Sequence, residues 1–74
     1  IIDRLIIDQG KITIIDYKSH QAAQKENLVS LSEPYHEQIA LYAQGTKRIW
    51  PEHRIEAYLL FTHCAELHKM PLEF

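Results

Sequence analysis

Residues 1–20 read IIDRLIIDQGKITIIDYKSH, and this stretch decides the fold. Apolar and β-branched residues dominate both halves, and Gln9 and Gly10 separate them. This pattern predicts two strands, residues 1–8 and 11–19, joined by a tight turn. The second strand ends unusually, because Asp16 and Lys18 follow a run of isoleucines that is suited to a buried sheet.

The spacing of the hairpin brings these charged residues together with Asp3. A two-residue turn at Gln9 and Gly10 places Asp3 directly opposite Asp16, and side-chain alternation puts Lys18 on the same face. Opposed residues have Cβ atoms about 4.5–5.5 Å apart, so the two carboxylates repel unless one takes a proton or a cation lies between them. Hard oxygen ligands of this kind suit Mg²⁺ or Mn²⁺.

The prediction depends on the length of the turn. A three-residue loop would shift the register by one residue and place the two carboxylates on opposite faces of the sheet. The hydrophobic pattern favours the even-length turn, because that register leaves Arg4 and Thr13 off the main apolar face.

The rest of the chain predicts one helix and two further strands. Residues 20–32 form a polar loop with at most one helical turn, and Ser32 is the expected capping hydroxyl of a helix over residues 34–50. Residues 54–62 form a third strand and residues 67–74 a short edge strand limited by its proline. The helix is supported by apolar residues at helical spacing, namely Tyr35, Ile39, Tyr42, Ala43 and Ile49. The order strand, strand, helix, strand, strand is a mixed α/β arrangement.

Composition limits the class of protein. The chain has 74 residues, of which 46% are hydrophobic and 24% charged, as in one small soluble domain with a marginal core. It begins inside an apolar run, so we expect a piece of a longer polypeptide, and no run approaches the roughly 18 residues of a membrane span. A net charge of -2 argues against binding nucleic acid through bulk positive charge. The single cysteine, Cys64, excludes an internal disulfide and fits a reducing cytosol.

Three motifs in order resemble the PD-(D/E)XK nuclease superfamily: Asp3 in IIDRL, Asp16 and Lys18 in IIDYKS, and Gln38 with Tyr42 in QIALY. The glutamine-x-x-x-tyrosine motif, one helix after the D-Y-K strand, resembles the RecB-like branch of that superfamily. This branch includes the nuclease domains of the RecB and AddA helicase–nucleases. The run EPYHEQIALYAQGTKRIWPEHRIEAYLLFT is similar to the C-terminal end of bacterial AddA subunits.

The resemblance implies a restriction-endonuclease-like fold and a metal-dependent DNA nuclease. Asp3, Asp16 and the backbone carbonyl of Tyr17 would be ligands of Mg²⁺ or Mn²⁺. Lys18 would orient or activate the attacking water in phosphodiester hydrolysis. The chain would be an incomplete domain, since the upstream helix that carries a further His or Glu ligand in the family has no counterpart here.

The resemblance also implies an accessory role for Gln38 and Tyr42, which would line the site or face the DNA. It implies a parent of the AddA type that processes double-strand DNA ends in the bacterial cytoplasm, with DNA and a partner helicase–nuclease subunit as its partners and no membrane. The iron–sulfur cysteines of some relatives are absent, so we expect no cluster. The isolated chain is expected to be weakly active or inactive.

Simpler interpretations stand beside these. Asp16 and Lys18 alone could be a same-face ion pair at a strand end, and Gln38 and Tyr42 alone are ordinary helix residues. A zinc site at His63, Cys64 and His68 lacks the usual paired ligand spacing. Lys47, Arg48 and Arg54 could form a small phosphate-facing patch, but a solvated helix end is the better interpretation. For function, the alternatives are a non-catalytic DNA-docking or protein-interaction module with the nuclease fold, and a stand-alone RecB-like exonuclease.

Overall fold

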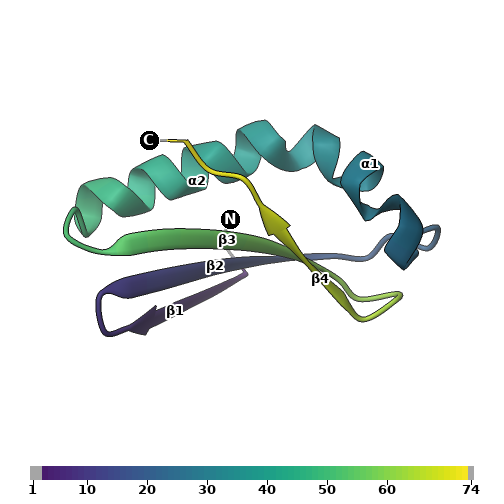
Figure 1. Ribbon diagram of the computed structural model, residues 1–74, viewed down its shortest axis with the longest axis horizontal. Helices are drawn as coiled ribbons and strands as arrows, with labels where there is room; N and C mark the ends of the chain where they lie inside the picture. Colours follow the sequence, from purple (N-terminus) through teal and green to yellow (C-terminus); the bar gives the residue numbers. More distant parts are fainter. Residues whose placement is uncertain (1–2, 74) are drawn as a thin grey trace.

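The computed structural model describes residues 3–73, which form a four-stranded mixed sheet with helices on one face (Figure 1). The strand order is β1-β2-β3-β4; β2 and β3 are parallel, whereas the two outer pairs are antiparallel. The strands are β1 (Arg4–Asp8), β2 (Lys11–Lys18), β3 (Arg54–Phe61) and β4 (Glu66–Met70). This arrangement confirms the predicted mixed α/β core. Ile1, Ile2 and Phe74, at the ends of two predicted strands, lie outside the described residues.

The crossover from β2 to β3 is more helical than the sequence predicts. Four consecutive segments occupy it: η1 (Lys25–Asn27), α1 (Leu28–Ser32), η2 (Glu33–Tyr35) and α2 (His36–Ile49). The prediction that Ser32 caps the main helix is wrong, because Ser32 is the last residue of α1 and its hydroxyl donates to the carbonyl of Val29 at 2.8 Å. Parallel strands require a long crossover of this kind, and here it returns along one face of the sheet (Figure 1).

The core lies between α2 and the two central strands. The side chains that meet there are Ile12 and Ile14 of β2, Ala57, Leu59 and Phe61 of β3, and Ile39 and Ala43 of α2. All of these are almost completely buried. The predicted apolar stripe of the helix is correct except at Ile49, which is 67% exposed. The buried stripe continues instead through Thr46, whose hydroxyl donates to the Tyr42 carbonyl one turn earlier at 2.8 Å.

The strand β1 is exposed on both sides. Leu5 and Ile7 are directed to the same face as the buried isoleucines of β2, yet they remain 38% and 53% exposed. The cause is position, because β1 is the edge of the sheet and α2 packs over β3. The hairpin end that carries the acidic residues is therefore accessible from the side of β1.

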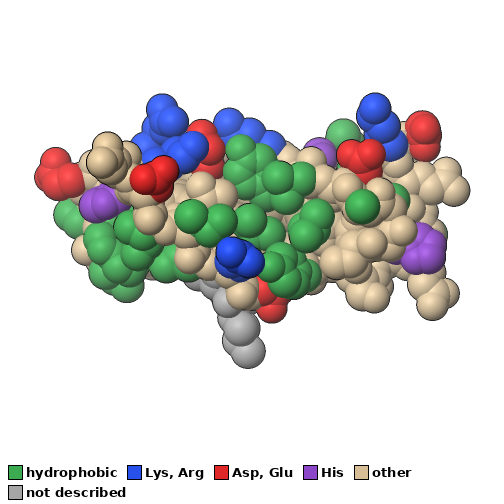
Figure 2. Space-filling view, turned by 90° about the horizontal axis from the view of Figure 1, so that it is seen from below, with side chains coloured by type: hydrophobic (Ala, Val, Ile, Leu, Met, Phe, Trp, Pro, Cys, Tyr) green, Lys and Arg blue, Asp and Glu red, His purple; other side chains and the backbone are tan. Residues whose placement is uncertain are grey.

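The face of the sheet opposite α2 is not covered by any described helix, and we call it the open face. Figure 2 shows this face with apolar side chains across its middle and Lys and Arg side chains among them. By side-chain alternation its apolar residues are Ile6, Ile15, Tyr17, Tyr58, Leu60 and Leu67. Among residues 3–73, none of the helices combines the length and hydrophobicity needed to span a membrane.

Candidate active site

The hairpin has the register that the even-length turn predicts. Arg4 pairs with Ile15 and Asp8 with Lys11, so the continuation of the ladder brings Asp3 beside Asp16. Gly10 allows this turn because its φ of 69° lies in the left-handed region. The predicted register is confirmed, and both carboxylates lie on the side of the sheet that α2 covers.

The two carboxyl groups are in very different environments. Asp16 is 5% exposed, whereas Asp3 is exposed and accepts a hydrogen bond from the backbone N–H of Tyr17 at 2.8 Å. Burial raises the pKa of Asp16, and the hydrogen bond between the two carboxyl groups raises it further. The same hydrogen bond, together with the Tyr17 N–H, lowers the pKa of Asp3. The two neighbouring carboxyl groups thus have pKa values shifted in opposite directions, upward for Asp16 and downward for Asp3.

Lys18 completes the cluster. Its Nζ lies 2.9 Å from Oδ2 of Asp16, the distance of a charge-assisted hydrogen bond, and its side chain is only 18% exposed. The ammonium also lies over the ring of Tyr35, 4.1 Å from the ring centroid. No sequence motif pointed to Tyr35, which was predicted only as one of the apolar residues of the helix. Tyr35 ends η2, so the segment that leads into α2 covers the amine.

Gln38 and Tyr42 contact each other on α2. The side-chain amide of Gln38 donates to the Tyr42 hydroxyl at 3.1 Å, and Tyr42 packs against the core while Gln38 is exposed. Figure 1 shows α2 running back over the sheet in the direction opposite to β2. Gln38 lies in the first turn of α2, three residues beyond Tyr35, so it is near the end of the helix that lies closest to Lys18.

The comparison with known proteins decides the family. The family model of the PD-(D/E)XK nuclease superfamily matches residues 1–73. The chain belongs to the PD-(D/E)XK nuclease superfamily. Membership supports a nuclease whose substrate is DNA, in a superfamily that generally uses divalent metal ions. No curated protein and no solved structure matches the chain.

The acidic pair fits the divalent ions used by this nuclease superfamily. Asp3 and Asp16 offer hard carboxylate oxygens at one point, where two carboxyl groups face the single ammonium of Lys18. Within residues 3–73, however, no group of three or more His, Cys, Asp or Glu side chains gathers into a metal site. The described residues thus supply two acidic ligands, and a bound ion would take its remaining oxygens from backbone, water and phosphate.

Proposed function

We propose that this chain is the catalytic core of a Mg²⁺- or Mn²⁺-dependent DNA nuclease of the RecB-like branch. The observation that carries the proposal is one cluster: a buried Asp16 beside Asp3, with the ammonium of Lys18 at 2.9 Å. A plain surface ion pair needs neither the second carboxylate nor the burial. The motifs of Asp3, Asp16, Lys18, Gln38 and Tyr42 support the assignment to the branch.

Each residue of the cluster has a distinct role in the proposed hydrolysis. Asp3 and Asp16 hold the divalent ion, with the backbone carbonyl of Tyr17 as a further ligand. When bound, such an ion polarises a phosphate oxygen and lowers the pKa of coordinated water. Lys18 places positive charge where negative charge accumulates on the phosphate and helps to orient the attacking water. For this role the ion pair between Lys18 and Asp16 must weaken, because the metal ion and the ammonium share the carboxylate of Asp16.

The side chains on the helical side position the cluster. Tyr35 is a positioning residue, because its ring holds the ammonium of Lys18 above the end of β2. Gln38 and Tyr42 line the approach to the cluster from α2 and contact the DNA strand. The hydrogen bond between them fixes the amide of Gln38 against the helix surface.

The biological setting that we propose is an AddA-type helicase–nuclease in the bacterial cytoplasm. Such a protein would process double-strand DNA ends for recombinational repair together with a partner subunit. The net charge of -2 suits this setting, because a bound cation neutralises the acidic cluster and other domains supply the basic path for the DNA.

Metal binding by the chain itself is the first test. Titration with Mn²⁺, followed by the loss of the free-ion paramagnetic resonance signal, should show one site in the wild-type chain. Asp16→Asn should weaken that site at least tenfold, since it removes one of two acidic ligands. Asp8→Asn is the matched control, because Asp8 is an exposed aspartate at the opposite end of the same hairpin. Equal Mn²⁺ affinity in all three proteins would disprove the metal site.

Cleavage separates the nuclease from its alternative, a non-catalytic module that docks on DNA or on a protein. In the longer protein that contains this core, Lys18→Ala should abolish Mg²⁺-dependent cleavage of linear DNA and leave DNA binding unchanged. Lys25→Ala, a change at an exposed lysine of η1, should leave both unchanged. Full cleavage by the Lys18→Ala protein would support the docking module.

A further inference from the structure

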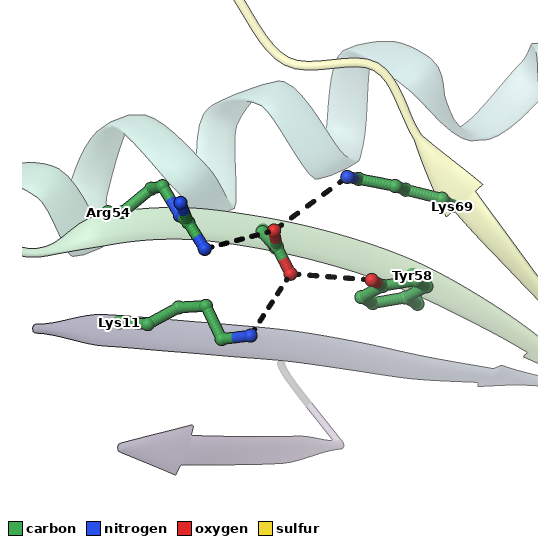
Figure 3. A network of polar contacts seen from close by, with 5 residues as sticks. Lys11, Arg54, Tyr58 and Lys69 are labelled. Atoms are coloured by element: carbon green, nitrogen blue, oxygen red, sulfur yellow. Dashed lines mark hydrogen bonds and ion pairs between the residues drawn. The ribbon is translucent and has the colours of Figure 1, made fainter. Parts of the chain in front are cut away.

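A second charged cluster lies on the open face, away from the acidic pair. Glu56 of β3 is surrounded by Lys11 of β2, Arg54 of β3 and Lys69 of β4, with nitrogen-to-oxygen distances of 3.6, 3.8 and 3.7 Å (Figure 3). The hydroxyl of Tyr58 donates to the same carboxylate at 3.3 Å. We call these five residues the Glu56 cluster. It brings β2 together with the β3–β4 hairpin, which follows much later in the sequence.

The cations of the Glu56 cluster are only loosely held. All three distances to Glu56 exceed the 2.9 Å between Lys18 and Asp16 and the roughly 2.7–2.9 Å of a charge-assisted hydrogen bond. The three cationic side chains are 39%, 72% and 62% exposed. Within the cluster, Glu56 balances one of three positive charges, while Asp8, the cross-strand partner of Lys11, adds a carboxylate beside that lysine. The N–H donors of the exposed cations remain accessible to a further anion.

A cleft opens beside the cluster. It has a volume of about 490 Å³ and lies where the chain leaves β4 and no longer pairs with the start of β3. Its rim carries Arg54, Glu56 and Lys69, and its remaining lining is apolar: Ile55, Met70, Pro71 and Leu72. A volume in this range accommodates a small planar group. Cations at the rim and an apolar interior are complementary to a phosphate joined to an unpaired base.

We propose that the Glu56 cluster and its cleft bind single-stranded DNA, with backbone phosphates on Lys11, Arg54 and Lys69 and an unpaired base in the cleft. The choice of DNA as the polymer rests on the proposed function. The binding energy of this site does not depend on the acidic cluster. Glu56 spaces the cations and lowers the affinity of the site, because its charge repels phosphate. Single-stranded DNA is favoured over duplex because a paired base cannot enter the cleft.

The test is binding without cleavage. A fluorescein-labelled oligonucleotide of about 20 thymidines is titrated with the chain in EDTA and about 50 mM salt, with fluorescence anisotropy as the readout. Each phosphate contact on a single strand releases about 0.7 counterion, which corresponds to about eightfold in affinity at this salt concentration. Lys69→Gln and Lys11→Gln should each weaken binding by up to that factor and lower the salt slope by about 0.7.

Two variants make the test specific. Lys25→Gln makes the same change of charge in η1, outside the sheet, and should alter the affinity less than twofold. Glu56→Gln should bind at least twofold more tightly, because it removes the repelling charge and keeps an acceptor for Tyr58. Weaker binding by Glu56→Gln, or equal losses in Lys69→Gln and Lys25→Gln, would overturn the proposal. So would equal affinity for a duplex of the same length.

The outcome is independent of the nuclease assignment. The binding test is run in EDTA, so no metal ion is held at the acidic pair, and Lys11 and Lys69 lie on the face of the sheet opposite to Asp16. Failure of the Mn²⁺ or cleavage tests would remove the proposed active site and leave this result standing. Failure of the anisotropy test would remove the binding site on the open face alone.

Discussion

Tyr35 should stabilise the protein through the ammonium of Lys18, and the size of this effect follows from the structure. The Nζ atom lies 4.1 Å from the ring centroid, well inside the roughly 6 Å limit for a cation–π contact. Such contacts contribute about 0.5–1 kcal/mol when exposed and about 2 kcal/mol when desolvated. Because the side chain of Lys18 is 18% exposed, we expect a coupling free energy of about 1–2 kcal/mol.

A double-mutant cycle measures this coupling directly. Tyr35→Leu, Lys18→Met and the double variant are unfolded with urea, and the free energy of unfolding is compared with that of the wild type. The cycle cancels the separate loss of the Lys18–Asp16 ion pair, which occurs equally with either residue at position 35. A domain of this size is stable by only about 4–11 kcal/mol, so the expected coupling is a measurable fraction of the total.

Tyr35→Phe is the matched control, because it keeps the aromatic face and removes only the hydroxyl. Its coupling with Lys18→Met should remain within about 0.5 kcal/mol of the tyrosine value. If Tyr35→Leu and Lys18→Met are additive within about 0.3–0.5 kcal/mol, the ring does not hold the ammonium. Tyr35 would then have no positioning role at the site.

Two further predictions concern stability. Partial burial works to raise the pKa of Glu56, but the three surrounding cations outweigh it and the pKa lies below its ordinary value of 4.5. Ionised Glu56 therefore adds to the free energy of unfolding in full above pH 4.5, and this contribution is lost as the pH falls through the lower pKa of the folded state. In urea unfolding, Glu56→Gln should lose less stability on acidification than the wild type does. The backbone predicts opposite effects at two turn positions: Gly10 has φ 69° and Ala65 has φ 54°. Gly10→Ala should destabilise the protein by about 1–2 kcal/mol, and Ala65→Gly should stabilise it by up to about 1 kcal/mol. Midpoint temperatures of thermal unfolding that shift equally and in the same direction in both variants would contradict this.

The parts of the fold that depend on short-range sequence pattern could be predicted from the sequence. The apolar alternation and Gly10 determine the length of the first turn, and the turn determines that Asp3 meets Asp16. The helix and the third strand were likewise predictable from periodicity within a residue or two. At the end of α2 periodicity failed, because it assigns Ile49 to the core by its hydrophobicity, whereas the geometry of the helix turns Thr46 inward.

The contacts of the two charged clusters depend on tertiary arrangement and could not be read from the sequence. Tyr35 reaches Lys18 through a crossover in which η1 and α1 replace the predicted loop and η2 leads into α2. The Glu56 cluster requires β3 to lie between β2 and β4, and neither the strand order nor the parallel pair was predictable from local pattern. Arg54 starts β3 as predicted, but local pattern could not show that it lies beside cations from both neighbouring strands.

Strand alternation explains how a chain with a net charge of -2 can carry an acidic pair on one face of its sheet and a group of cations on the other. Asp16 and Lys18 are directed toward α2, where the carboxyl groups of Asp3 and Asp16 outnumber the single ammonium of Lys18. Lys11 starts the same strand but is directed to the open face, where it joins two other cations around a single carboxylate. Net charge averages these two surfaces, although the sheet separates them. The net charge of the chain is therefore no argument against either proposed site, because each site depends on the local charge of its own face.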